Sequence, residues 1–228
     1  LGRMAAGVAH EINNPLTSIL LNAHLLLEQP GRSEAEIEAL GFIADETKRC
    51  AEIVAGLLDF SRQTPSVSVP VDINEIIERT LGLLENQASV RNIRIVRALD
   101  PGLPEIAIDK NKIRQVFSNL ALNACEAMPG GGTLTVASRL NRDGTGIEIC
   151  FADTGVGIAK ENIARLFDPF FTTKTFGTGL GLAVSYGIIR RRGGTILVRS
   201  EPGQRTEFTV FIPLADLGDE MHAEEEPQ

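Results

Sequence analysis

Cysteine is scarce in this sequence, and no long hydrophobic run is present. The three cysteines, Cys50, Cys125 and Cys150, cannot all pair within one chain, and none belongs to a Cys-X-X-Cys motif. Each lies in an apolar periodic segment, so we expect reduced, buried thiols that bind no metal, in a cytoplasmic protein. No stretch of about 18 consecutive apolar residues occurs, which argues against a membrane-spanning helix, and no signal peptide is evident.

The sequence also lacks an excess of basic residues. It has 22 lysines and arginines against 30 aspartates and glutamates, which leaves a net charge of −8. Such a chain has no basic field to attract a nucleic-acid backbone or an anionic membrane, so we expect neither as a partner. Its 228 residues, 43% hydrophobic and 23% charged, have room for one large or two small soluble domains.

Two amphipathic helices are predicted in the first 62 residues. Residues 1–28 carry apolar side chains at alternating spacings of three and four, the period of a helix that packs along one seam. Pro15 lies inside this pattern, removes one backbone donor and should bend the helix just after His10. A second helix follows a short break, and Ser33 with Glu36 forms a capping box at its start.

The two helices should form an antiparallel hairpin whose apolar stripe is only half covered. Two copies would complete a four-helix bundle, so we expect a homodimer through residues 1–62. His10 lies two positions past Val8, off the apolar seam and toward solvent, where a reactive side chain has to be. We expect His24 to be an ordinary surface residue. Because the chain begins inside a helical pattern without a cap, we expect it to be part of a longer protein.

The remaining sequence predicts a two-layer α/β sandwich. Residues 63–70 are polar, contain two prolines and should be a linker or hinge, whereas residues 71–215 alternate between helical and strand-like segments. Residues 216–228 are acidic and turn-like, so we expect a disordered tail. The expected helices are 73–87, 109–128 and 180–192, and the expected strands, which form a mostly antiparallel sheet, are 93–96, 105–108, 133–140, 147–152, 195–200 and 207–212.

Two asparagines in the predicted helix 109–128 form the first candidate site. Asn119 and Asn123 are four residues apart and therefore lie on one helical face. An amide oxygen is a neutral, hard ligand, which suits a Mg²⁺ ion that already carries phosphate charge. The alternative is that both asparagines are solvated or cap the helix end.

A carboxylate and two glycines at the end of a predicted strand form the second candidate site. Asp153 can accept a hydrogen bond from an exocyclic amino group such as that of adenine. Gly155 and Gly157 follow at alternate positions and would let the backbone approach a flat ring, because no Cβ atom is in the way. The alternative is a plain glycine-rich turn.

A third candidate site lies in the glycine-rich segment before the helix 180–192. Gly177, Gly179 and Gly181 precede the helix N-terminus, where backbone N–H groups can bind phosphate. The segment is not a dinucleotide fingerprint, because no strand directly precedes it. Residues 167–174 (FDPFFTTK) combine aromatic and polar side chains, and Lys174 is placed to reach a terminal phosphate; the alternative is a surface loop.

Each motif alone is ambiguous, but the ordered set is not. The asparagine pair, the Asp-X-Gly-X-Gly motif, the Phe-X-Pro-Phe motif and the Gly-X-Gly-Leu-Gly motif follow one another downstream of the His-Glu-X-X-Asn-Pro motif at residues 10–15. This set resembles the ATP-binding domain of sensor histidine kinases, within the superfamily shared with Hsp90, gyrase B and MutL. The segment around His10 resembles the dimerisation and phosphoacceptor domain of the same kinases. The resemblance covers residues 1–214, and the wording of residues 167–174 is most similar to the nitrogen-regulation subgroup.

The resemblance implies a fold and a set of roles. The fold is a dimeric four-helix bundle followed by a Bergerat-type ATP-binding sandwich, and the missing N-terminal part would hold the sensor domain. His10 would be the phosphoacceptor, Asn123 would ligate Mg²⁺, Asn119 would support the phosphates and Asp153 would bind the adenine amine. The other residues implied to bind ATP are Gly155 and Gly157 at the base, Thr173 and Lys174 near the triphosphate, and Gly177, Gly179, Leu180 and Gly181 at the phosphate-binding end of a mobile lid.

One position departs from the family pattern. Many of these kinases carry a basic residue three positions after the asparagine that binds Mg²⁺, but here that position is Glu126. Whether Glu126 contacts the nucleotide stays open at this point, and Lys174 could supply the missing positive charge.

The residues beside His10 suggest a mechanism. A neutral imidazole is nucleophilic near pH 7, and Glu11 would take its proton or orient its tautomer during attack on the γ-phosphorus of ATP. The phosphoryl group would then pass to an aspartate of a response-regulator receiver domain. Asn14 lies one helical turn after His10, and the resemblance implies that it orients water for dephosphorylation of the receiver. We therefore expect a kinase that is also a phosphatase of its regulator.

Two other functions remain possible at this point. The chain could be a superfamily ATPase that uses ATP closure mechanically, although such relatives lack the His-Glu-X-X-Asn-Pro helix. It could also be a phosphatase or a non-enzymatic module that binds ATP poorly, although its glycines, Asp153 and Asn123 are intact.

Overall fold

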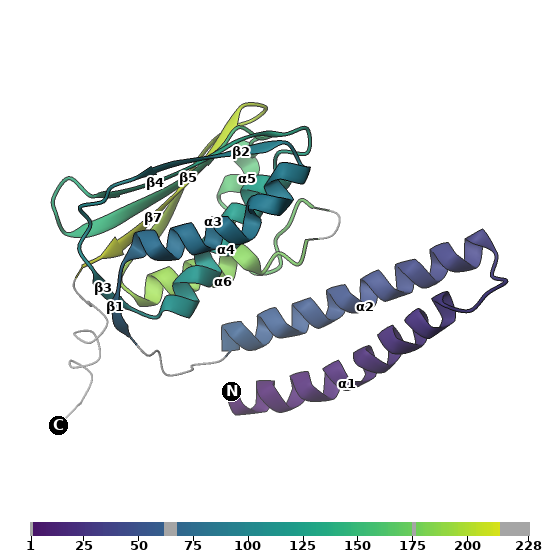
Figure 1. The fold of residues 1–228 in the computed structure, drawn as a ribbon. Helices are drawn as coiled ribbons and strands as arrows, with labels where there is room; N and C mark the ends of the chain where they lie inside the picture. Colours follow the sequence, from purple (N-terminus) through teal and green to yellow (C-terminus); the bar gives the residue numbers. More distant parts are fainter. Residues whose placement is uncertain (1, 62–67, 175–176, 215–228) are drawn as a thin grey trace, which may run out of the picture. The chain divides into compact units, whose positions relative to one another are not determined.

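The computed structural model describes residues 2–61, 68–174 and 177–214, which fall into two compact units (Figure 1). One unit holds the N-terminal helical hairpin together with residues 169–184. The other unit holds the sheet and the helices packed on it. The prediction of a helical hairpin followed by an α/β sandwich is confirmed. The predicted tail at residues 216–228 lies outside the described residues.

The hairpin consists of α1 (Gly2–Leu27) and α2 (Glu34–Ser61). Helix α1 is helical on both sides of Pro15, so the expected bend beneath His10 stays a prediction. Among the side chains of the two helices that the structure describes, the buried ones are small, namely Ala23, Ala44 and Thr47. Small side chains let two helices approach closely, and several larger apolar side chains of the hairpin, such as Ile19 and Leu21, are exposed.

The start of α2 has the predicted capping box. The Ser33 backbone N–H donates to Glu36 Oε2 at 2.8 Å, and the Glu36 N–H donates to Ser33 Oγ at 3.3 Å. Hydrogen bonds from the Ser33 backbone N–H and hydroxyl to the carboxylate stabilise its charged form and lower the pKa of Glu36. The reciprocal pair satisfies two backbone donors that the first helical turn leaves without an intrahelical partner, which explains why the helix begins here.

The sheet has five strands in the order β2-β4-β5-β7-β6. Strand β2 (Ile93–Leu99) is parallel to β4 (Gly132–Leu140), and the other neighbouring pairs are antiparallel. The remaining strands are β5 (Gly146–Asp153), β6 (Thr195–Glu201) and β7 (Arg205–Pro213). The mostly antiparallel sheet agrees with the prediction from the sequence, except that the predicted strand 105–108 is not one of its strands.

Helices cover one face of this sheet. Figure 1 shows α3 (Ile73–Val90) and α4 (Lys110–Glu126) side by side beneath the strands, with α6 (Gly181–Arg191) on the same face. Alternate residues of β5 are buried toward the helices, which is the pattern of a strand with one covered face. Phe117 of α4 and Phe151 of β5 meet there with ring centroids 5.6 Å apart. Asp153 continues the same buried row, so the sheet itself places this carboxylate under the helices.

Two short elements were not predicted. Strand β1 (Val69–Val71) pairs with β3 (Ile106–Ile108) in a separate two-stranded sheet, so the end of the stretch expected to be a linker is a strand. The preceding residues 62–67 lie outside the described residues, and the predicted domain boundaries stay predictions. The short helix α5 (Lys160–Ile163) lies between the second and third motifs.

The cysteines agree only in part with the prediction. Cys125 is buried and Cys150 is half-buried, but Cys50 is exposed on α2, so the expectation that all three thiols are buried is wrong. Cys50 lies outside the three-four seam of its helix, and its apolar neighbours in the sequence face other directions. Burial raises the pKa of the Cys125 thiol, and it raises the pKa of Cys150 to about 11. No described helix is both long and apolar enough to cross a membrane.

Candidate functional site

Helix α1 carries the predicted phosphoacceptor segment. The side chains of His10 and Glu11 lie outside the described residues, but their backbone belongs to the continuous helix Gly2–Leu27. Asn14 is exposed on the same helix, one turn after His10, so the helical backbone places both residues on one face. His24 is also exposed, as predicted.

Helix α4 carries the two asparagines. Asp109 caps its N-terminus by accepting from the backbone N–H groups of Asn111 and Lys112. The apolar face of α4 is buried against the sheet, and Asn119 and Asn123 lie beside that face, both half-buried. Their side chains therefore start at the border between the core and the surface, where an amide can serve a bound ligand.

The Asn119 amide has a protein partner. Its Nδ2 donates to the hydroxyl oxygen of Ser185 on α6 at 3.2 Å. Ser185 is completely buried, with 0% of its surface exposed. Ser185 belongs to none of the sequence motifs, although a serine on the buried face of a largely apolar helix is a detectable signal.

Asp153 ends strand β5 with only 3% of its surface exposed. Its Oδ1 accepts a hydrogen bond from the Gly155 N–H at 2.9 Å. Burial raises the pKa of this carboxyl group, and hydrogen bonds from the backbone of Gly155 and Thr206 oppose the increase. A buried carboxylate is a strong acceptor in a region of low dielectric, which suits it to an amino donor.

The two glycines after Asp153 are required by the chain's own backbone. A Cβ atom on Gly155 would lie 2.4 Å from the Ala127 carbonyl oxygen, and one on Gly157 would lie 2.3 Å from the Glu201 carbonyl oxygen. Gly157 also has a positive φ of 69°. The predicted reason, room for a flat ring, is therefore not the only one, because these glycines first allow the loop to pack on the protein.

This packing brings two of the motifs together. The Val156 N–H donates to the Ala127 carbonyl oxygen at 2.9 Å, just past the C-terminal end of α4. Asn123 lies one turn before Ala127, and its own carbonyl oxygen accepts from the Ala127 N–H at 3.0 Å. The loop after Asp153 and the asparagine helix thus meet at one end of the sheet.

The glycine-rich segment belongs to the other compact unit. Phe170 has a φ of 66°, and its N–H donates to the Gly179 carbonyl oxygen at 3.1 Å. A Cβ atom on Gly179, whose φ is 68°, would lie 2.4 Å from the Phe170 carbonyl carbon. Only glycine therefore fits at position 179. Residues 175 and 176 lie outside the described residues.

The segment leads into α6, as the sequence predicts, whereas the phosphate-binding roles of its residues stay predictions. Thr173 and Lys174 are exposed, and the Gly177 N–H donates to the Lys174 carbonyl oxygen at 3.3 Å. Leu180 is buried, and Gly181 is the first residue of α6. The glycine run thus ends at a helix N-terminus, where backbone N–H groups are available to an anion.

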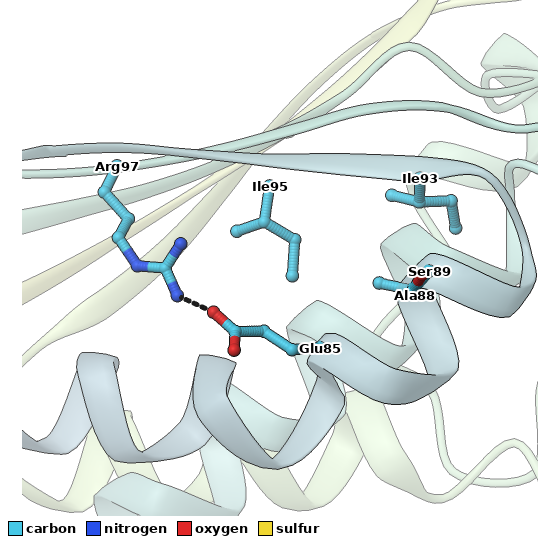
Figure 2. Close-up of a pocket in the computed structure, with 6 residues that line it drawn as sticks. All are labelled: Glu85, Ala88, Ser89, Ile93, Ile95 and Arg97. Carbon is cyan, nitrogen blue, oxygen red and sulfur yellow. Dashed lines mark hydrogen bonds and ion pairs between the residues drawn. The ribbon is translucent and has the colours of Figure 1, made fainter.

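The cavity in Figure 2 is separate from these motifs. It measures about 230 Å³ and lies between α3 and the edge strand β2. Arg97 donates to Glu85 beside it at 2.5 Å, and Arg97 also pairs with Glu78 at 2.9 Å. None of the residues predicted to bind ATP lines this cavity, and it is smaller than the roughly 300–1,000 Å³ of typical ligand pockets. We do not assign it to the nucleotide.

The side chains present fit a magnesium nucleotide. Among the described residues, no group of three or more His, Cys, Asp or Glu side chains could hold a metal ion alone. Mg²⁺ in nucleotide sites typically keeps several waters and takes one or two protein ligands together with phosphate oxygens. The amide pair on α4 and the acceptor at Asp153 are side chains of the kind that such a site uses.

Two family models match the chain. Residues 1–66 match the His Kinase A (phospho-acceptor) domain, and residues 108–216 match the histidine kinase-, DNA gyrase B- and HSP90-like ATPase. The sensor histidine kinase ZraS of Escherichia coli K12 is 39% identical over 215 residues, which are 94% of this chain and 46% of ZraS. The chain thus spans about half the length of the curated relative.

Solved structures show the same relationship. The catalytic domain of histidine kinase ThkA is 31% identical with a TM-score of 0.58, over 64% of this chain and 95% of that domain. ThkA in complex with the response regulator protein TrrA has a TM-score of 0.70 and 28% identity, over 95% of this chain and 62% of that one. Full-length ShkA in complex with AMPPNP has a TM-score of 0.77 and 28% identity, over 95% of this chain and 46% of ShkA.

Proposed function

The chain belongs to the histidine kinase family, and from this premise we propose that it autophosphorylates His10 from ATP and passes the phosphoryl group to a response regulator. The observation that carries the proposal is the presence, in one chain, of a His-Glu-X-X-Asn-Pro helix and a sandwich with a buried acceptor at Asp153. A mechanical ATPase of the wider superfamily needs the second feature but not the first.

The α/β unit would bind and orient ATP. Asp153 would accept from the adenine amine, and its burial favours this specific hydrogen bond over contact with water. Asn123 would ligate Mg²⁺, and Asn119 would support the phosphates. When bound, Mg²⁺ would neutralise charge on the phosphate oxygens. Thr173, Lys174 and the backbone before α6 would complete the phosphate contacts.

The hairpin would supply the nucleophile. A neutral His10 nitrogen would attack the γ-phosphorus, forming an N–P bond while the bond from that phosphorus to the bridging oxygen breaks. ADP leaves with that electron pair, and the ring proton passes to Glu11. The attack requires the neutral form of the ring, because a neutral imidazole nitrogen is nucleophilic near pH 7.

The second reaction would transfer the phosphoryl group to an aspartate of a receiver domain. Support comes from the relative ThkA, whose structure is a complex with the response regulator protein TrrA. Asn14, exposed one turn after His10, would orient water when the regulator is dephosphorylated. The chain would therefore act as both kinase and phosphatase, with its activities directed by a sensor domain.

The hairpin would also form the homodimer. Several large apolar side chains on α1 and α2 are exposed, and three of them, Ile12, Ile19 and Leu26, recur every seven residues on α1. A spacing of seven keeps these side chains on one stripe. A second hairpin would cover the stripe and complete a four-helix bundle.

Autophosphorylation is tested with γ-labelled ATP and Mg²⁺. We expect acid-labile, base-stable label on the wild-type protein, none on His10→Gln, and full label on His24→Gln. His24 is the matched control because it is an exposed histidine on the same helix. Phosphate release without protein label would favour the ATPase, and receiver dephosphorylation without label or turnover would favour a phosphatase module.

A further inference from the structure

Ser185 is a buried polar residue that no motif includes. It lies on α6 among the buried apolar residues Val184, Ile188 and Ile189, with 0% of its own surface exposed. Its hydroxyl oxygen accepts a hydrogen bond from Asn119 Nδ2 at 3.2 Å. A buried hydroxyl in an apolar environment is costly unless it is hydrogen-bonded, so the contact with Asn119 accounts for a serine at this position.

The contact determines which end of the Asn119 amide faces α6. A side-chain amide has a donor end and an acceptor end, and they differ completely in what they offer a phosphate or a cation. A serine inside a helix commonly donates its own proton to the carbonyl group four residues earlier, which leaves its oxygen as an acceptor. An acceptor at Ser185 binds the NH₂ end of Asn119 and turns the amide oxygen away from α6.

We propose that Ser185 is a positioning residue for nucleotide binding, which acts by holding the Asn119 amide in one orientation. The inference rests on the proposed function, in which Asn119 supports the phosphates of Mg²⁺-ATP. Ser185 itself does not touch the nucleotide. Because α6 begins directly after the glycine run, the same contact ties the helix that follows this run to the helix that carries both asparagines.

A merely structural role makes a different prediction from a positioning role. Loss of a buried hydrogen bond would destabilise the fold and lower the affinity of the α/β unit for every ligand to a similar extent. Loss of the amide orientation would lower the affinity only for ligands that carry phosphates and Mg²⁺. Adenosine, which would depend on Asp153 and not on Asn119, separates the two cases.

The test compares Ser185→Ala with Ser138→Ala by calorimetric titration. Ser138 is the matched control: it is 4% exposed on β4, and its hydroxyl donates to Asn74 Oδ1 at 2.7 Å, away from all predicted nucleotide contacts. For Ser185→Ala we expect a roughly tenfold weaker Kd for Mg²⁺-ATP, as loss of one hydrogen bond gives, and an unchanged Kd for adenosine. Ser138→Ala should change neither Kd, although both variants should unfold at lower temperature.

A double-mutant cycle shows whether the effect passes through Asn119. In an Asn119→Ala background, Ser185→Ala should cause no further loss of Mg²⁺-ATP affinity. Ser185→Cys, which keeps the volume with a weaker acceptor, should lie between serine and alanine and serves if Ser185→Ala does not fold. Equal losses for Mg²⁺-ATP and adenosine, or additive losses in the cycle, would overturn the inference. A wild-type protein that binds no Mg²⁺-ATP would instead overturn the proposed function.

Discussion

At the scale of single residues, the candidate site depends on polar groups that the fold buries, although burial of a polar group is energetically unfavourable. Asp153 is a carboxyl group buried at the end of a strand, and Ser185 is a hydroxyl buried in an apolar helix. Each retains a hydrogen bond to a neighbouring group, which limits the cost of burial. Such residues reduce stability in return for a defined acceptor, so a variant that relieves the cost should gain stability and lose affinity.

Asp153→Asn tests whether stability rises while affinity falls. Burial raises the pKa of Asp153, so the folded state favours the neutral acid, and a neutral amide of the same shape should unfold less readily at pH 7. Affinity for ATP should fall about 10- to 100-fold, because a charge-assisted hydrogen bond to the adenine amine becomes a neutral one. Unfolding in urea and titration with ATP measure the two effects.

The gain in stability should depend on pH in one direction. An unfolded aspartate has a pKa of about 3.9, and the folded value is higher, so folding takes up a proton between the two values. The contribution of Asp153 to the free energy of unfolding therefore falls as the pH rises from the unfolded pKa through the folded pKa, and it stays low at higher pH. The gain from Asp153→Asn should be small near pH 4 and largest at pH 7.

A control variant isolates the ligand effect. Asp100→Asn changes a carboxylate that likewise accepts from a glycine N–H two residues later at 2.9 Å, but outside the candidate site. It should leave ATP affinity unchanged. Unchanged ATP affinity in Asp153→Asn, or a loss of its stability at pH 7, would contradict the role given to Asp153.

At the scale of elements, loops and helix ends bring the motifs together. The loop after β5 is tied on one side to the end of α4 through Val156 and Ala127, and on the other to the β6–β7 turn, where the Gly203 N–H donates to the Val156 carbonyl oxygen at 2.7 Å. Helix α6 contributes Ser185 to Asn119 and, at the next position, Tyr186, whose ring stacks on Phe167 with centroids 4.7 Å apart.

The β5 loop is tested by comparing two glycines with a positive φ. Gly157→Ala places a Cβ atom 2.3 Å from the Glu201 carbonyl oxygen, whereas a Cβ atom on Gly203, with a φ of 76°, would have nothing within 4 Å. Gly203→Ala should cost only the left-handed backbone strain, about 1–2 kcal/mol. Gly157→Ala should cost roughly 3 kcal/mol or more, because the backbone must also shift. Urea unfolding of both variants measures the difference. Equal losses in the free energy of unfolding would show that the loop can shift to accept the Cβ atom.

The sequence predicted the elements that have a local signal and missed those that depend on distant partners. The capping box at Ser33 and the long amphipathic helices were found because propensity and period act within a few residues. Strand β1 has only three residues and exists through its pairing with β3, so its polar, proline-containing neighbourhood indicated a linker.

The candidate site shows the same division. Ordered motifs selected Asn119, Asn123 and Asp153, and the structure places all three in one unit. The hydrogen bond from Asn119 to Ser185 joins residues 66 positions apart, and no local sequence pattern predicts that these two residues pair. The clashes that make Gly155 and Gly157 necessary likewise come from Ala127 and Glu201, which only the folded chain brings close.

At the scale of the whole molecule, the hairpin is an incomplete structure by itself. Large apolar side chains remain exposed on it, including Leu21 with 58% and Phe42 with 65% of their surface open to solvent. The exposed stripe of Ile12, Ile19 and Leu26 is the part that a second hairpin would cover. Hydrophobic burial along such a stripe is the dominant favourable term in association, so assembly should be sensitive to a single charge placed there.

Ile19→Glu should therefore convert the dimer to a monomer. Ile19 is 46% exposed in the single chain and lies in the middle of the stripe, nine positions from His10, so the charge would be buried in the bundle without altering the phosphoacceptor itself. Burying an unpaired carboxylate costs roughly 3 kcal/mol or more, which corresponds to a dissociation constant of the dimer at least about 100-fold higher. Leu83→Glu is the matched control, because Leu83 is an apolar residue with 76% of its surface exposed on α3, outside the hairpin. Sedimentation velocity should give a dimer for the wild type and Leu83→Glu and a monomer for Ile19→Glu. A dimer in all three proteins would mean that association uses a surface other than this stripe, and the bundle would then have to be placed elsewhere on the hairpin.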